Sequence, residues 1–219
     1  MAQDPAPAPA STLEADARAD AASDAPTKSA RTRERILDAA AHVLSRKGYA
    51  GTRLSDIAER ARLQAPAIYY YFSSRDELIE EVMWVGVARV HAHVAAELAA
   101  LPDDTSPLDR IMKAVEEHLR YELLISDYTT ASIRNANQVP EELRARPAAE
   151  EARYAQIWRD LFIAAQEAGQ LRPDLDVAIT RLLLLGAMNW AAEWWNPRHR
   201  TLDDLVRATQ DMVRHGITA

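Results

Sequence analysis

The sequence predicts an all-α fold with two parts: a three-helix N-terminal domain containing a helix-turn-helix, and a C-terminal helical bundle. Two short helical patterns, at residues 54–61 and 65–71, are joined by only three residues. Such a short connection fixes two helices at a steep mutual angle. Beyond them apolar residues recur at helical spacing, and stretches with proline or glycine at residues 101–107 and 169–173 divide this pattern into separate helices.

The first helix of this pair has a start signal and an apolar face. Thr52 is a good N-cap, and Asp56 suits the positive end of the helix dipole. Ile57, Ala58 and Ala61 then lie on one side of the helix. We expect this side to pack inward.

The second helix supplies the partners of that face. Ile68 and Phe72 are four residues apart and so share one side. Pro66 fits only in the first turn, where the N–H that proline lacks would have no partner anyway. The next helix can be capped either by Ser73 with Asp76 or by Ser74 with Glu77. The residues left for solvent or a ligand are Ala65, Ala67, Tyr69 and Tyr70.

Charge is distributed unevenly along the chain. Residues 28–75 hold ten basic and four acidic residues, a net charge of +6, whereas residues 76–219 carry −9 and residues 1–27 carry −4, within a total of −7. A basic module in an acidic protein is typical of a domain that contacts the phosphate backbone. We expect DNA contact from the arm that holds Lys28, Arg31, Arg33 and Arg35; a solvated basic face is the alternative.

A family resemblance covers about residues 30–78. It rests on Gly48, Thr52, Ile57, Ala58, Ala61, Tyr69, Phe72, Arg75 and Leu78. This pattern is similar to the N-terminal domain of TetR-family transcriptional repressors. The family usually has glycine where this chain has Arg62, and serine or threonine where it has Gln64. An arginine fits that turn if φ stays negative, or if a strain of roughly 1 kcal/mol is tolerated.

The resemblance implies a set of DNA contacts. Base-contacting positions fall on Ser55, Gln64, Ala65, Pro66, Ala67 and Tyr69, and phosphate-contacting positions on Arg53, Tyr70, Tyr71 and Arg75. The chemistry suits these roles, because a glutamine can pair with adenine and tyrosine hydroxyls and arginines can hold phosphates. The alternative for the three consecutive tyrosines is core packing. On a helix they point in three directions, so they cannot all be core.

The chain is expected to divide into a disordered tail over residues 1–27, a DNA-binding domain over residues 28–75 and a ligand-binding and dimerisation domain over residues 76–219. It has no cysteine, which excludes disulfides and thiolate metal sites. No signal peptide is seen in the tail, and no glycine-rich phosphate loop or shared histidine ligand spacing is present. We expect a cytoplasmic protein without a cofactor, metal or enzymatic activity.

Residues 74–101 are predicted to form one long helix that links the two domains, followed by helices at about 107–126, 127–137, 140–168, 174–195 and 201–215. Pro147 is expected to separate the first turns of the fourth of these from the rest. Within the long helix His93 and Glu97 have a spacing that could suit a metal, but a single i,i+4 pair is usually a surface coincidence.

The segment 182–192 is apolar nearly all round and too short to span a bilayer. It should therefore be buried against both its own domain and a partner. With the amphipathic helix that follows, it can form a four-helix interface in a homodimer, and the family dimerises through its last two helices in this way.

A second resemblance lies near the C-terminus, in residues 169–176, 188–190 and 194–197. They are similar to the branch of the family that governs fatty-acid and steroid side-chain breakdown, whose members commonly respond to acyl-CoA thioesters. Interface packing is the alternative for Trp194 and Trp195.

An apolar effector would need a pocket walled by aromatic and flexible side chains, with ordinary core packing as the alternative for each of them. Arg134 is the candidate partner of an anionic group, unless it forms a surface salt bridge. The candidates are Trp84, Met112, Tyr121, Tyr128, Arg134, Trp158, Phe162, Met188 and Trp190.

The sequence thus predicts a homodimeric, ligand-responsive repressor that binds a palindromic operator in double-stranded DNA and is released by an apolar effector, with acyl-CoA as the class suggested by the branch. A drug-responsive regulator of an efflux pump is the alternative of the same kind. A non-specific architectural DNA-binding protein is the alternative from another class.

Overall fold

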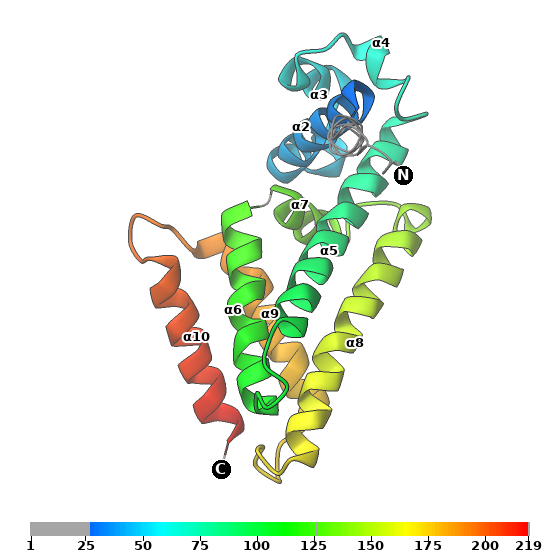
Figure 1. The fold of residues 1–219 in the computed structure, drawn as a ribbon. Helices are drawn as coiled ribbons and strands as arrows, with labels where there is room; N and C mark the ends of the chain where they lie inside the picture. Colours follow the sequence, from blue (N-terminus) through cyan, green and yellow to red (C-terminus); the bar gives the residue numbers. More distant parts are fainter. Residues whose placement is uncertain (1–26, 126, 219) are drawn as a thin grey trace, which may run out of the picture. The chain divides into compact units, whose positions relative to one another are not determined.

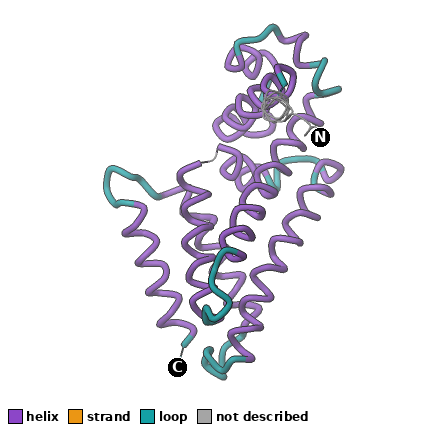
Figure 2. The backbone as a smooth tube through the Cα atoms, in the orientation of Figure 1, coloured by secondary structure: helices purple, strands orange, loops and turns teal. Residues whose placement is uncertain are grey.

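The computed structural model describes residues 27–125 and 127–218. Within these ranges the chain forms nine α-helices, one 3₁₀ helix and no strand (Figure 2). The all-α prediction is confirmed. The tail expected over residues 1–27 lies outside the described residues except for Thr27. No helix among the described residues is long and apolar enough to cross a membrane.

Helix α2 (Lys28–Gly51) crosses the boundary between two units of the chain, which meet at Arg35 and Ile36. In the first unit Thr27 caps the helix, because the Ala30 N–H donates to Thr27 Oγ1 at 3.1 Å. Three side chains of the basic arm, Lys28, Arg31 and Arg35, are exposed there.

In the second unit, α2 buries one face and then ends at a glycine. Its buried residues include Ile36, Leu37 and Leu44. Gly48 has φ 70°, which interrupts the helical conformation. The positive φ at this position favours glycine, because a residue with a Cβ rarely adopts it.

Helices α3 (Leu54–Ala61) and α4 (Ala65–Ile68) form the predicted helix-turn-helix. The bounds of α3 agree with the prediction, whereas α4 is shorter than the predicted 65–71. The Tyr71 N–H donates to the Ile68 carbonyl at 2.9 Å, an i→i+3 bond that tightens the chain into a turn after Ile68. The two apolar partners, Ile68 and Phe72, are buried as expected.

The predicted N-cap of α3 was wrong. Arg53 occupies the N-cap position and makes no side-chain cap bond. Thr52 is buried, and its hydroxyl donates to the Gly48 carbonyl at 2.7 Å. It therefore stabilises the turn between α2 and α3, because a hydroxyl one position earlier is better placed for the preceding carbonyl than for the first amides of α3.

Arg62 ends α3 in the left-handed conformation, with φ 55° and ψ 48°. It is the only described residue other than glycine with a positive φ. The Leu63 N–H reaches back to the Ala58 carbonyl at 2.9 Å, which is the bond pattern of a left-handed helix C-cap. Arginine thus adopts a conformation that normally suits glycine.

Helix α5 (Arg75–Ala99) is the long linking helix that the sequence predicts. Its cap is Ser74, whose side chain accepts from the Glu77 N–H at 3.0 Å, so the second of the two predicted capping pairs is the one observed. Val82 and Val85 of α5 belong to the apolar cluster that holds α2, α3 and α4, while Val90 and Val94 belong to the cluster of the C-terminal helices. One rigid element therefore takes part in both cores.

The C-terminal bundle packs around α5, with α6 and α8 on either side of it in Figure 1. The predicted helix at 140–168 is divided, because a 3₁₀ turn precedes α8, and Pro147 lies in the first turn of α8. Helix α9 begins later than predicted, where Asp176 caps it by accepting from the Ile179 N–H at 2.9 Å. The elements are α6 (Pro107–Ile125), α7 (Asp127–Asn135), η1 (Glu141–Leu143), α8 (Ala145–Glu167), α9 (Val177–Trp194) and α10 (Leu202–Ile217).

The strained turn at Arg62 yields a stability prediction. Arg62→Gly should raise the free energy of unfolding by about 0.5–1 kcal/mol, since the left-handed strain of a residue with a Cβ exceeds the entropy that glycine loses on folding. Arg60→Gly is the matched control, because glycine inside a helix should instead lower stability by about 1 kcal/mol. Urea unfolding of the three proteins measures both changes, and a destabilised Arg62→Gly protein would contradict the assignment of strain.

Candidate functional site

The surface around α4 is rich in exposed side chains of the predicted DNA-contacting set. Tyr69 is 57% exposed and Tyr70 is 82% exposed, which is unusual for tyrosines in a folded domain. Tyr71 is half-buried, and its ring meets that of Tyr70 edge-on at 5.1 Å between centroids. Arg53, Ser55, Gln64 and Pro66 are also exposed, and Ala65 and Ala67 are half-buried.

Arg75 is the member of the predicted set that is already engaged within the chain. Its Nε donates to the Thr52 carbonyl and its Nη1 to Asp76 Oδ1, each at 2.8 Å, and its Nη2 donates to the Tyr49 carbonyl. The guanidinium also lies 4.3 Å from the centroid of the Tyr49 ring. Arg75 thus links the turn before α3 to the start of α5.

A cavity of about 380 Å³ lies among helices α5 to α9. Its volume is within the range of small-molecule sites, about 300–1,000 Å³. Most of its surface is apolar, although six of its thirteen lining residues carry polar side chains. The lining residues are Gly86, Val87, Val90, His118, Thr129, Ser132, Ile133, Ala136, Glu151, Tyr154, Ala155, Leu185 and Asn189.

His118 is the centre of the polar part of this cavity. Its Nδ1 lies 2.8 Å from the Tyr154 hydroxyl, and its Nε2 lies 3.1 Å from Asn189 Oδ1. Glu122 Oε2 is 3.0 Å from Nε2, but neither Glu122 oxygen accepts a hydrogen bond from the described residues. Burial, together with the nearby Glu122 carboxylate, raises the pKa of Tyr154, so its phenol stays protonated.

The nine residues predicted to bind an effector do not line this cavity. Met112, Trp158, Phe162 and Met188 are buried in the bundle core, and Trp190 is 62% exposed. Their role in binding stays a prediction.

The other four are held by separate contacts. Trp84 lies under the Arg146 guanidinium, 3.9 Å from the ring centroid. Tyr121 stacks at a tilt near His93, with ring centroids 5.0 Å apart. The remaining two, Tyr128 and Arg134, connect α7 to neighbouring helices.

The sequence reasoning missed His118, Tyr154 and Asn189. A signal was present for the first of them: His118 and Glu122 fall at helical spacing on the same stripe as Ile111 and Val115, and all four are buried. Polar residues within an apolar stripe mark a buried polar site, since each needs a partner inside the protein.

Helix α7 contacts α2 on one side and lines the cavity on another. The Tyr128 hydroxyl donates to Asp38 at 2.9 Å, His42 Nδ1 lies 2.8 Å from Asp127, and Asn135 Oδ1 accepts from the Tyr49 N–H at 2.7 Å. Arg134 donates to the Ser45 carbonyl at 3.0 Å and pairs through two nitrogens with Glu193 of α9. The pairing lowers the pKa of Glu193.

Helices α9 and α10 present an exposed apolar face. Leu182 and Leu183 are 60% and 69% exposed, and Trp194 and Met212 are 57% and 61% exposed. On the opposite side of α9, Leu184, Met188 and Ala191 are buried. The apolar run at 182–192 is therefore buried on one side only within a single chain, and its exposed side is a surface of the kind that marks protein contacts.

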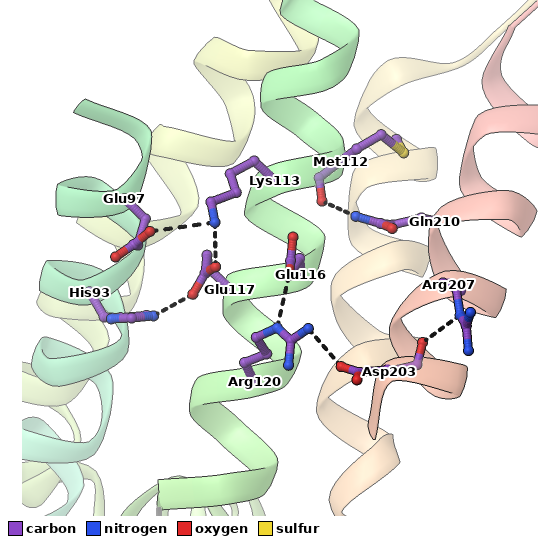
Figure 3. Close-up of polar contacts among 10 residues, drawn as sticks. All are labelled: His93, Glu97, Met112, Lys113, Glu116, Glu117, Arg120, Asp203, Arg207 and Gln210. Atoms are coloured by element: carbon purple, nitrogen blue, oxygen red, sulfur yellow. Dashed lines mark hydrogen bonds and ion pairs between the residues drawn. The ribbon is translucent and has the colours of Figure 1, made fainter. Parts of the chain in front are cut away.

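One group of described residues has the spacing of metal ligands: His93, Glu97 and Glu117. Figure 3 shows that the Lys113 ammonium lies between the two carboxylates, 2.6 Å from Glu117 and 3.4 Å from Glu97. Burial opposes ionisation of Glu117, but hydrogen bonds from Lys113 and His93 outweigh it and lower its pKa. The Lys113 ammonium already balances the charge of the two carboxylates. The cluster therefore links α5 to α6 through ion pairs.

The same view shows how α6 is tied to α10. Arg120 pairs with Glu116 at 2.8 Å and with Asp203 of α10 at 2.7 Å, and Gln210 donates to the Met112 carbonyl at 2.9 Å (Figure 3).

Two family models match the chain. Residues 36–82 match the model described as bacterial regulatory proteins, tetR family, and residues 104–217 match the tetracyclin repressor-like C-terminal domain. The second match alone covers more than half of the 219 residues.

Individual relatives share about a quarter of their residues with this chain or fewer. The HTH-type transcriptional repressor KstR2 of Mycolicibacterium smegmatis is 23% identical over 80% of this chain and 85% of its own length. The HTH-type transcriptional regulator UidR of Escherichia coli K12 is 25% identical, with coverages of 73% and 79%.

A solved structure shares the fold. The crystal structure of AibR in complex with isovaleryl coenzyme A and operator DNA superposes with a TM-score of 0.75 at 21% identity, over 83% of this chain and 97% of that one. The matched models cover both the helix-turn-helix and the bundle, and the chain belongs to the TetR family of transcriptional regulators.

Proposed function

We propose that this protein is a cytoplasmic, homodimeric repressor that binds a palindromic operator and leaves it when an apolar effector occupies the cavity among α5 to α9. The observation that carries the proposal is that one helix, α7, both lines the cavity and is hydrogen-bonded to α2. Occupancy of the cavity can therefore change the position of α2. An effector shifts this equilibrium only to the extent that it binds the released conformer more tightly.

The DNA-reading role is supported by the exposure of the α4 surface. Gln64 and Tyr69 are exposed polar side chains at the ends of α4, where they are free to meet base edges and phosphates. Pro66 and the methyl groups of Ala65 and Ala67 add small apolar surface suited to a thymine methyl. Arg53, at the N-cap of α3, is exposed and suits a phosphate.

The homodimer is supported by the apolar face of α9 and α10. Leu182, Leu183, Trp190, Trp194 and Met212 are all more than half exposed in the single chain. Burying this face against a second copy removes it from water, and a two-fold pairing of two helices per chain gives a four-helix interface. A two-fold dimer also matches a palindromic operator.

The effector class is supported by the cavity and by one structural neighbour. The lining is largely apolar, and the structural neighbour AibR was crystallised with isovaleryl coenzyme A and operator DNA. An acyl-CoA thioester whose acyl group enters the cavity is our preferred effector. A drug-responsive regulator of an efflux pump is the second candidate, since an apolar cavity also suits lipophilic drugs.

Gln64 and Tyr69 are the two residues that we expect to read the base sequence. Gln64→Ala combined with Tyr69→Ala should abolish most discrimination between the operator and an unrelated duplex, because a bidentate base contact is worth about 1–3 kcal/mol. Competition binding at fixed salt measures the loss, and circular dichroism checks that helicity is retained. An unchanged sequence preference in the folded variant would refute the assignment.

Arg53→Ala is the matched control for that experiment. It should weaken binding to every duplex alike and make the salt dependence shallower, because it removes a phosphate contact and not a base contact. Arg75 is unsuitable as this control, since its loss also removes the tie to the Thr52 and Tyr49 carbonyls. Equal affinity of the unmodified protein for all duplexes would favour the architectural alternative.

The effector class can be tested on the full chain by ligand binding and operator release. Acyl-CoAs should raise the melting temperature of the protein and release it from its operator, whereas lipophilic cationic dyes should do neither; binding to the native state stabilises it by mass action. Ala155→Trp, which fills the cavity, should abolish the response. Ala152→Trp on the exposed side of α8 should preserve it. Stabilisation by dyes alone would favour the efflux-pump regulator.

A further inference from the structure

The polar groups of the cavity restrict what kind of effector it accepts. Its lining residues include no lysine or arginine, and the one acidic side chain among them is Glu151. Behind His118, the Glu122 carboxylate is fully buried and accepts no hydrogen bond from the described residues. A free carboxylate or phosphate in this cavity would therefore meet no lysine or arginine among the lining residues to offset the hydration that it gives up.

Asn189, another lining residue, offers a hydrogen-bond donor whose orientation its neighbours fix. Asn189 Oδ1 lies 3.1 Å from His118 Nε2, which assigns the oxygen of the amide to the histidine and leaves the NH₂ group for other partners. His118 is itself fixed from the other side by the Tyr154 hydroxyl at 2.8 Å. The chain Tyr154, His118, Asn189 thus holds an amide donor at the edge of an apolar cavity.

We propose that this cavity recognises an uncharged carbonyl group on a compact apolar molecule, with the Asn189 amide as the hydrogen-bond donor and His118 as the residue that positions it. A ketone and a thioester both present such a carbonyl. The cavity, at about 380 Å³, is near the lower limit for small-molecule sites, so it takes the acyl portion of a thioester and leaves the larger headgroup outside. The inference rests on the proposed effector role of this cavity.

The test compares probes of matched length on the full chain. Calorimetry with heptyl methyl ketone, octanoate and octanoyl-coenzyme A should show that the ketone and the thioester bind, and that octanoate binds at least about tenfold more weakly, a difference of about 1.4 kcal/mol. Octanoate bound as tightly as the ketone would overturn the proposal. Binding of the ketone without the thioester would identify a free ketone as the source of the carbonyl, and the reverse would identify the thioester.

Variants at Asn189 test the donor. Asn189→Asp keeps an oxygen for His118 but removes the NH₂ group, and should weaken ketone binding about tenfold. Asn189→Leu removes the amide without adding charge and should weaken ketone binding several-fold, which keeps the test valid if the aspartate variant does not fold. Asn196→Asp, at an exposed asparagine outside the cavity, should leave binding unchanged. Full ketone affinity in both Asn189 variants would contradict the role of the amide.

Operator release measured in parallel separates this inference from the proposed function. If acyl-CoAs release the operator and Ala155→Trp blocks release, while ketone and carboxylate bind alike, the regulator stands and the carbonyl assignment falls. If the probes bind with the expected preference but Ala155→Trp changes neither their binding nor operator release, the ligand site lies elsewhere. Both the effector role of this cavity and the carbonyl assignment are then wrong. If none of the three probes binds, the carbonyl assignment falls, whatever releases the operator.

Discussion

Helices α5 and α7 approach each other so closely at Gly86 that no side chain fits between them. A Cβ on this residue would lie 2.8 Å from Ser132 Oγ and 2.9 Å from the Tyr128 carbonyl oxygen, and the second of these is backbone that cannot swing away. The Ser132 hydroxyl completes the contact by donating to the Met83 carbonyl at 3.1 Å. Because well-packed helices shift as units when one more carbon is inserted, the positions of α5 and α7 are strictly linked.

This linkage gives the cavity its mechanical importance. Gly86 and Ser132 both line it, so a ligand that presses on either helix acts on the pair. On its far side α7 holds α2 through Tyr128 and Asn135, and it holds α9 through the ion pair of Arg134 with Glu193. An effector that moves α7 would therefore also act on the helices that α7 contacts directly. These are α2, which precedes the helix-turn-helix, and α9, which we assign to the dimer interface.

Much of the fold could be predicted because helix bounds and caps depend on residues close together in the sequence. The site could not, because it depends on which helices meet in the folded chain. The bounds of α3, the cap of α5 and the burial of Ile68 and Phe72 follow from spacing within a few residues. The cavity depends instead on which faces of α5 to α9 meet, so aromatic content led to residues such as Trp158 and Phe162, which fill the core. Thr52 and Arg75 show the same limit, since their partners are carbonyls whose positions only the folded turn defines.

The most direct test of a ligand-released repressor is selection and sequencing of genomic fragments that the purified protein binds at physiological salt, with and without a mixture of acyl-CoAs. The account predicts recovery of a palindrome whose binding falls when the mixture is added. A palindrome that is indifferent to the mixture would contradict the acyl-CoA effector, and the absence of any enriched sequence would contradict the repressor itself.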